Sequence, residues 1–196
     1  MSSRRLRSPL AVTVLGMLAE EPLHPYAMRR RVAERAYERL PGVRATSVYD
    51  VVRRLEQAGL VHADETGRAG NRPERTRYTI TAAGMQTRTG WVSEALADDA
   101  DPDGLAVALS FMYALGRDRV TGLLRARLDR LTRALDADRA TLAGAEKGGA
   151  APIFLSEHRY ELARRQAERD WIAGFLADLR DGRLDWPAAG AAVTPG

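Results

Sequence analysis

The sequence of 196 residues contains no cysteine, which excludes disulfide bonds and thiolate metal sites. It has no apolar run approaching the length of about 18 residues that a membrane span needs. The basic start, MSSRRLRS, is followed by apolar residues at helical spacing without a small-residue cleavage site, so we expect no signal peptide. On these grounds we expect a soluble, cytoplasmic protein that does not enter a membrane.

Motifs that carry catalysis are also missing. The sequence has no Gly-x-Ser-x-Gly, no P-loop and no dinucleotide-binding fingerprint. Its histidines, His24, His62 and His158, are scattered. Glu157 and Glu161 flank His158 closely enough to share a metal ion, but a solvated helix face is the interpretation we favour. We therefore expect no enzyme, no metal and no cofactor.

Charge is distributed unevenly along the chain, whose net charge is +4. Residues 1–90 contain 16 basic and 9 acidic residues, whereas the remainder contains 14 basic and 17 acidic residues. A basic half next to an acidic one is typical of a polyanion-binding domain joined to a second domain, and nucleic acid is the commonest such partner. A solvated charged surface is the alternative, so the local patterns must decide.

Two short helices are predicted near the start of the basic half. In SPLAVTVLGMLAEEP, Ser8 can cap the helix, Pro9 suits its first position and Pro22 lies beyond its end. In HPYAMRRRVAERAYERL, a proline again stands in the first turn. The apolar face predicted for this second helix comprises Tyr26, Val32 or Ala33, Ala36 and Leu40.

A third helix is predicted within ATSVYDVVRRLEQAGLV. Ser47 followed by Asp50 resembles a capping box, and Gly59 suits a left-handed C-cap. One face has helical apolar spacing, and it comprises Val48, Val51, Val52 and Leu55. The opposite face carries Tyr49, Asp50, Arg53, Arg54 and Gln57, and its function is the question that this stretch raises.

The next segment changes its period. LVHAD and RTRYTIT are predicted as two short strands, joined by the turn-forming stretch ETGRAGNRPE. Three helices followed by a basic hairpin is the order of a winged helix-turn-helix, in which the third helix enters the DNA major groove. Arginine and glutamine suit base edges there, and tyrosine can reach phosphate. Asp50 is less expected, and it can accept from a cytosine amino group or stabilise the helix start.

Three stretches, HPYAM, SVYDVVRRLEQAGLV and GNRPERTRYTITAAG, resemble the signature elements of the PadR family of bacterial transcriptional regulators. The resemblance implies that Ser47, Tyr49 and Arg53 contact DNA and that Arg72 and Arg75 are wing contacts. Two departures are Pro25, where the family has glycine, and Asp50, where proline is common. Helix order alone also permits a winged helix of the MarR type, which these motifs do not favour.

The second half is predicted to be helical. AAGMQTRTGWVSEALAD reads as a helix capped by Thr81 and carrying Trp91 and Leu96, and the acidic stretch DDADPDG reads as a linker. LAVALSFMYAL is apolar almost all round and therefore suits a buried helix. A leucine seam typical of a coiled coil follows, comprising Leu124, Leu128, Leu131, Leu135 and Leu142.

After KGGAAP, a last long helix is predicted within IFLSEHRYELARRQAERDWIAGFLADLRDG. Its apolar side comprises Tyr160, Ala163, Ala167, Trp171, Phe175 and Leu179. Two long helices with a short connection pack antiparallel, and a second chain would cover the apolar surface that they leave. This layout is similar to PadR members with a long helical dimerisation domain. Tyr160 and Trp171 are candidates for an effector pocket, as the ligand-responsive members of that family imply, although core or dimer packing is the interpretation we favour.

The expected fold is mainly α with a small β-hairpin wing. We divide it into a winged helix-turn-helix DNA-binding domain (1–86), a helical dimerisation domain of antiparallel long helices (87–185) and a disordered tail (186–196). The expected function is that of a homodimeric repressor that binds a palindromic operator in double-stranded DNA and is released by a small aromatic effector. A helical module that uses the winged helix for protein contact is the alternative, against which the basic wing argues. The candidate DNA-binding residues are Ser47, Tyr49, Arg53, Arg54, Gln57, Arg68, Arg72, Arg75 and Arg77.

Overall fold

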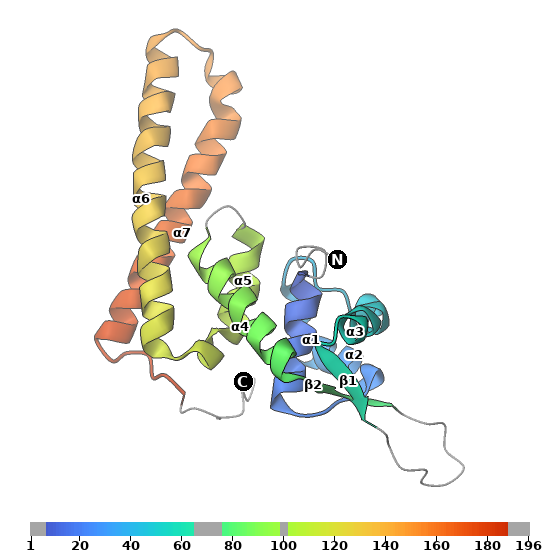
Figure 1. Ribbon diagram of the computed structural model, residues 1–196. Helices are drawn as coiled ribbons and strands as arrows, with labels where there is room; N and C mark the ends of the chain where they lie inside the picture. Colours follow the sequence, from blue (N-terminus) through green and yellow to red (C-terminus); the bar gives the residue numbers. More distant parts are fainter. Residues whose placement is uncertain (1–6, 65–75, 99–101, 188–196) are drawn as a thin grey trace. The chain divides into compact units, whose positions relative to one another are not determined.

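The computed structural model describes residues 7–64, 76–98 and 102–187 (Figure 1). The chain forms two compact units. The first comprises Met1–Ala95 with Asp101–Leu115 and Ala188–Gly196, and the second comprises Leu96–Ala100 with Gly116–Pro187. Within the described ranges, no helix is long and apolar enough to cross a membrane. The functional division at residue 86 stays a prediction, and most of the expected tail lies outside the described residues.

Helix α1 (Pro9–Glu20) is the centre of the first unit. Ser8 caps it as predicted, with its Oγ accepting a hydrogen bond from the amide of Ala11 at 3.2 Å. Helix α5 (Pro102–Phe111) packs against α1, and its Phe111 ring lies where a side chain at Gly16 would clash. A Cβ at Gly16 would lie 2.3 Å from that ring, so the close approach of the two helices requires glycine. Helix α5 is followed by the 3₁₀ helix η4 (Met112–Leu115) and begins within the stretch predicted as an acidic linker.

Helix α2 (Pro25–Glu34) corrects the predicted apolar face. It buries Met28 and Val32, whereas the side chain of Tyr26 is 61% exposed. The helix ends before the predicted positions because Ala36 adopts a φ of 53°, in the left-handed region that an α-helix cannot include. The chain then forms the 3₁₀ helix η2 (Tyr37–Arg39), whose Tyr37 is buried.

Helix α3 (Val48–Gln57) has the predicted apolar face, and all four members of that face are at most 2% exposed. Gly59, with a φ of 70°, ends the helix as predicted. The predicted capping box is wrong, because Ser47 makes no side-chain hydrogen bond to the helix start. A 3₁₀ turn, η3 (Ala45–Ser47), leads directly into α3, so Ser47 lacks the extended backbone that a capping serine usually adopts.

Strands β1 (Val61–Asp64) and β2 (Arg77–Ile80) form the predicted antiparallel hairpin, with Val61 opposite Ile80 and Asp64 opposite Arg77. Its connection, residues 65–75, lies outside the described residues. Thr81 then caps helix α4 (Ala82–Ala97), because its Oγ1 accepts from the amide of Gly84 at 3.0 Å. Trp91 and Leu96 of α4 are buried. Helix α3 therefore directly precedes the hairpin, and the capped helix α4 directly follows it.

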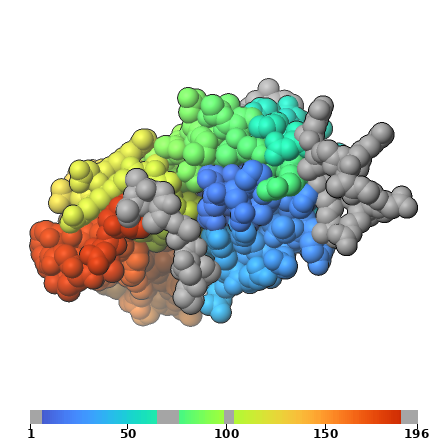
Figure 2. All heavy atoms as spheres, turned by 90° about the horizontal axis from the view of Figure 1, so that it is seen from below, coloured from blue at the N-terminus to red at the C-terminus, as the bar shows by residue number. Residues whose placement is uncertain are grey.

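In the second unit, the long helices α6 (Arg117–Lys147) and α7 (Ser156–Arg180) pack against each other as an antiparallel hairpin (Figure 1). The start of α6 (yellow) lies beside the end of α7 (red) in Figure 2. They are joined through the 3₁₀ helix η5 (Pro152–Leu155). The leucine seam of α6 is buried at Leu124, Leu131 and Leu135 and half-buried at Leu128 and Leu142.

The predicted apolar side of α7 is wrong in its rotation. The helix buries Ile172 and Leu179, whereas Tyr160, Ala163, Ala167 and Trp171 are exposed and Phe175 is half-buried. The apolar residues of α7 are thus distributed over two faces, of which only one packs within the chain.

An arginine lies within the apolar seam between these helices. Arg127 is fully buried and forms an ion pair with Glu168 of α7, with 2.7 Å between its Nη2 and Oε1 of Glu168. Its guanidinium also donates to the backbone carbonyl of Asp98. The leucine spacing did not predict a buried arginine, because position 127 is not one of the leucine positions of the seam. It fixes the register of α6 against α7 at one point.

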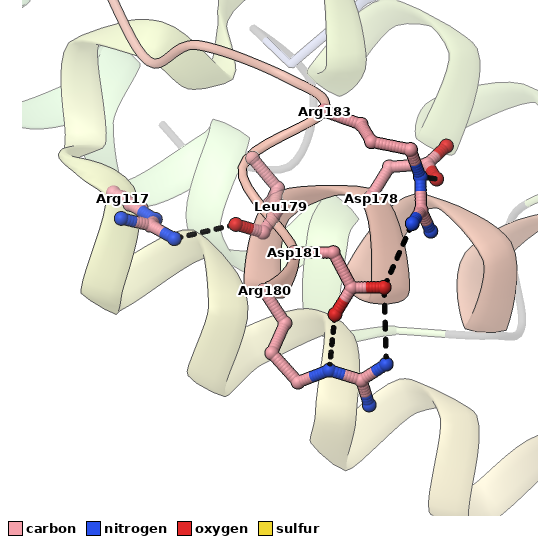
Figure 3. Close-up of polar contacts among 6 residues, drawn as sticks. All are labelled: Arg117, Asp178, Leu179, Arg180, Asp181 and Arg183. Atoms are coloured by element: carbon pink, nitrogen blue, oxygen red, sulfur yellow. Dashed lines mark hydrogen bonds and ion pairs between the residues drawn. The ribbon is translucent and has the colours of Figure 1, made fainter.

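Polar contacts close the open end of the hairpin (Figure 3). The guanidinium of Arg117, in the first turn of α6, donates to the carbonyl of Leu179 in the last turn of α7. A cation there adds a second donor to a last-turn carbonyl that also accepts from the amide of Gly182 at 3.4 Å, and it offsets the negative end of the helix dipole. Arg180 and Arg183 both pair with Asp181, at 2.7 and 2.8 Å.

Candidate nucleic-acid interface

The exposed face of α3 carries all the candidate DNA-binding residues of this helix. Tyr49 is 52% exposed, and Ser47, Arg53, Arg54 and Gln57 are exposed as well. The rotation of the helix about its axis is fixed by the four buried apolar residues on its other side, so these polar side chains cannot turn inwards. The helix therefore presents a rigid row of hydrogen-bond donors to solvent.

The two arginines of this face are held only loosely. The Nη2 of Arg53 lies 3.4 Å from Oδ1 of Asp50, and Nε of Arg54 lies 3.4 Å from the carbonyl of Asp50. Both contacts are long and exposed to solvent, where such a pair contributes little stability. Asp50 thus orients the arginines without engaging them strongly, and either guanidinium can turn to an incoming acceptor.

Of the wing candidates, Arg68, Arg72 and Arg75 lie outside the described residues. Arg77 is described, and its guanidinium donates to the carbonyl of Pro22 at 2.9 Å. This contact joins the start of β2 to the segment that precedes α2. Arg77 therefore has a structural contact in the isolated protein, which the sequence did not indicate.

The start of α2 is tied to the hairpin by backbone pairing. Leu23 forms an antiparallel bridge with Tyr78, with hydrogen bonds of 3.1 and 2.9 Å, and the Nδ1 of His24 lies 3.0 Å from the carbonyl of Thr76. These contacts place the first turn of α2 beside β2. They explain why residues distant in the sequence share one cavity.

A cavity of about 600 Å³ lies between the first turns of α2, the start of β2 and Tyr49 of α3. We call it the tyrosine cavity. Burial first, and then the carboxylate of Glu56, raise the pKa of Tyr78 above the ordinary value of a tyrosine. The lining combines aromatic rings with an arginine, and Tyr49 contributes to both the cavity and the exposed face of α3. The lining residues are His24, Pro25, Tyr26, Ala27, Arg30, Tyr49, Thr76 and Tyr78.

Tyr26 and Arg30 were not among the candidate site residues. Tyr26 was assigned to an apolar face together with Val32 or Ala33, Ala36 and Leu40. The pair Met28 and Val32, spaced by four residues, gives the rotation that the structure has, and it turns Tyr26 and Arg30 outwards. That apolar pair was the available signal.

The candidate effector residues, Tyr160 and Trp171, are 67% and 48% exposed on α7. Trp171 stacks on Phe175, with ring centroids 5.3 Å apart and an interplanar angle of 12°. The structure therefore presents these rings on an open helix face, and their role in ligand binding stays a prediction. Within the described ranges, no group of three residues is arranged to hold a metal ion.

The comparisons with known proteins identify a family match. Residues 14–89 match the family described as "Transcriptional regulator PadR-like family". This range contains the three stretches that resemble the signature elements of that family. The comparison with curated proteins found no match.

Several solved structures are similar to the chain. Bacillus subtilis PadR in complex with operator DNA is 19% identical, with 86% of this chain and 97% of that chain covered and a TM-score of 0.38. The protein smu.1604c from Streptococcus mutans UA159 is 20% identical, with coverages of 85% and 98% and a TM-score of 0.38. The PadR-like transcriptional regulator BC1756 from Bacillus cereus is 15% identical, with coverages of 88% and 98% and a TM-score of 0.38.

Proposed function

We propose, from the match of residues 14–89 to the PadR-like family of transcriptional regulators, that the chain is a homodimeric repressor that binds a palindromic operator in double-stranded DNA. The match to this family of regulators supports the expectation that the chain is not an enzyme. One observation carries the proposal of groove contact. Helix α3 exposes Tyr49, Arg53 and Gln57 on a face whose opposite side is locked into the core.

The side chains of this face suit direct reading of bases. Arg53 and Arg54 can each donate two hydrogen bonds to the O6 and N7 of guanine, and Gln57 can pair with the N6 and N7 of adenine. Ser47 and Tyr49 stand at the helix start and contact phosphate in this proposal. Arg68, Arg72, Arg75 and Arg77 of the wing would follow the DNA backbone, where cations add affinity without sequence preference.

The homodimer is supported by the exposed aromatic face of α7, comprising Tyr160 and Trp171 with the stacked ring of Phe175. A single hairpin of two helices leaves these rings in water, and a second copy of the same face would remove them from it. A two-fold dimer binds two half-sites about 34 to 36 Å apart, or a multiple of this spacing. Such an arrangement requires a palindromic operator.

Release by a small aromatic effector is an alternative role for the rings of this face, to be tested against their role in the dimer. The exposed ring of Trp171, stacked on Phe175, offers a flat apolar surface to such a ligand. An effector of this kind should quench tryptophan fluorescence and weaken operator binding together, because it acts through different affinities for two states. The Trp171→Phe variant should lose most of the quenching and keep the dimer, whereas loss of the dimer would favour a packing role.

To test whether α3 reads bases, the operator is first identified from the fragments of the host genome that bind to the full-length protein. Arg53→Ala should weaken binding to the operator by about 1 to 3 kcal/mol and relax the preference at one base position. The matched control is Arg133→Ala, which removes the same charge from an exposed position on α6. Titrations on the operator and on its single-base variants measure both effects.

Two outcomes contradict the proposal. If the parent protein enriches no fragment, the DNA-binding function is wrong. If Arg53→Ala and the parent bind all variants alike while both remain folded, α3 does not read bases, and an interaction module that contacts protein becomes the better explanation.

A further inference from the structure

The tyrosine cavity lies next to the face of α3 and has no part in the proposed reading of bases. Its lining comes from the first turns of α2, from the start of β2 and from Tyr49 of α3. Tyr26 and Tyr49 are 61% and 52% exposed, so a large molecule can reach both rings. The cavity therefore continues the exposed face of α3 towards α2.

The chemistry of the lining favours an anion attached to an apolar group. Arg30 contributes a guanidinium, and none of the described residues that line the cavity is a carboxylate. Its ion pair with Glu34, at 3.0 Å, joins two exposed side chains and contributes little stability, so the guanidinium can turn to another acceptor. The hydroxyls of Tyr26 and Tyr49 are further donors, while Pro25 and Ala27 add apolar surface.

We propose that the tyrosine cavity holds one backbone phosphate of the operator together with its deoxyribose. Arg30 and the hydroxyls of Tyr26 and Tyr49 donate to the phosphate oxygens, and Pro25 and Ala27 contact the sugar. This inference rests on the proposed DNA-binding function. It adds a contact by α2, the helix that crosses the backbone when its partner helix lies in the major groove.

The cavity is assigned to DNA and not to a free anion because of its continuity with α3. Tyr49 belongs to both surfaces, so a strand whose bases meet Arg53 and Gln57 passes its backbone over Tyr49 and into the cavity. The hydrogen bonds that join Leu23 to Tyr78 fix the first turn of α2 against the hairpin, so the cavity exists before DNA arrives. A preformed site of this kind sets the position of the protein on the duplex without reading sequence.

The experiment uses the full-length protein and operator fragments in which one phosphate at a time is replaced by an uncharged methylphosphonate. The parent should lose affinity when the phosphate in the cavity is replaced, and Arg30→Ala should be insensitive at that one position. Arg30→Ala should also bind the operator and unrelated DNA about tenfold more weakly and reduce the salt slope by about one unit. Tyr26→Phe keeps the ring but lacks the hydroxyl. When the same phosphate is replaced, this variant should lose less affinity for the operator than the parent does.

The matched control is Arg29→Ala, which removes the same charge from the next residue of α2, an exposed arginine outside the cavity lining. This variant should keep the parent's sensitivity to the methylphosphonate at the cavity position. If Arg29→Ala and Arg30→Ala behave alike, general charge explains the effect and the cavity contact is refuted. If inorganic phosphate at matched ionic strength binds the parent but not Arg30→Ala and leaves the affinity for the operator unchanged, the occupant is a free oxyanion and the contact to the operator is refuted.

Failure of this inference can be distinguished from failure of the proposed function. If Arg30→Ala and Tyr26→Phe bind every fragment like the parent while Arg53→Ala loses base preference, the cavity assignment is overturned and DNA reading stands. If the parent itself shows no preference for any fragment, the proposed function is wrong and the cavity inference falls with it.

Discussion

Helices α3 and α7 are both amphipathic, yet they expose opposite kinds of side chain. Helix α3 buries aliphatic residues and exposes Arg53 and Arg54, whereas α7 pairs Glu168 with a buried arginine and exposes Tyr160 and Trp171. An exposed row of cations suits a hydrated polyanion, and exposed rings suit a second apolar surface. The comparison indicates that the face of a helix that does not pack within the chain shows which kind of partner that helix can bind.

The largest effect is expected where the hairpin buries a charge. Arg127→Ala removes one member of the ion pair with Glu168, which is nearly buried itself, and should destabilise the protein by about 3 to 5 kcal/mol. Replacing both residues together, Arg127→Met with Glu168→Leu, should restore most of this stability because neither charge is then left unpaired. Urea unfolding followed by circular dichroism measures both. Equal losses in the single and double variants would show that the charge left unpaired on Glu168 is not what destabilises Arg127→Ala.

The exposed face of α7 gives the next largest effect. Trp171→Glu places a charge among the rings of the proposed dimer face and should weaken dimerisation by about 2 kcal/mol or more, about thirtyfold. Sedimentation equilibrium over a range of protein concentrations measures the dissociation constant. The control is Arg180→Glu, which introduces an acidic residue at an exposed position in the last turn of the same helix. Should Trp171→Glu dimerise as tightly as the parent, the interface lies elsewhere.

A buried arginine in the first unit, Arg88, allows a test of whether a buried charge destabilises the fold when no ion pair compensates it. Arg88 of α4 is 6% exposed and shares its helix face with the buried residues Trp91, Val92 and Ala95. Burial lowers the pKa of Arg88, while Tyr113 and the carboxylate of Glu20 oppose this shift, and within the described residues it makes no direct hydrogen bond or ion pair. Arg88→Met should therefore stabilise the protein by about 1 to 2 kcal/mol, since it replaces a buried charge that lacks a direct partner with an apolar side chain of similar length.

The measurement is again the midpoint of urea unfolding, with Arg133→Met as the matched change at an exposed position. Stabilisation of Arg88→Met alone agrees with an unpaired buried charge. A loss of stability would contradict that reading and would place Arg88 with Arg127 among the cations that the fold needs.

Much of the fold could be predicted because local signals agreed with it. Ser8, Gly59 and Thr81 mark the ends of helices as predicted, and the face of Val48 and Leu55 set the rotation of α3. These features depend on neighbouring residues, which the sequence displays directly. The exposed DNA-binding candidates on α3 followed from the same rotation.

The remaining features depend on contacts between distant segments. Arg127 can be buried because Glu168, on another helix, supplies its counter-charge and the carbonyl of Asp98 accepts from its guanidinium, and an arginine alone in a leucine seam gives no sign of either. The tyrosine cavity arises from the bridge between Leu23 and Tyr78, which no local pattern indicates. The rotation of α7 was wrong because the helix has two apolar faces, and composition alone could not say which one packs within the chain.

The smallest expected effect appears only at high pH. Burial first, and then the carboxylate of Glu20, raise the pKa of Tyr113 to about 12, against about 10 for an exposed tyrosine. The folded protein therefore holds the phenolic proton more tightly than the unfolded chain does. This contribution to stability is fully present below pH of about 10 and is lost as the pH rises through the folded pKa.

Absorbance of the phenolate should reveal one late ionisation in the parent that disappears in Tyr113→Phe. The unfolding free energy of Tyr113→Phe should also fall less steeply above pH 10 than that of the parent. Tyr78, whose pKa is raised as well, contributes in the same direction, so part of the loss should remain in the variant. The control is Tyr160→Phe, which removes a hydroxyl from the exposed face of α7 and should keep the parent's late ionisation. If Tyr113→Phe kept that ionisation as well, the late ionisation would belong to another tyrosine, and the raised pKa of Tyr113 would be refuted.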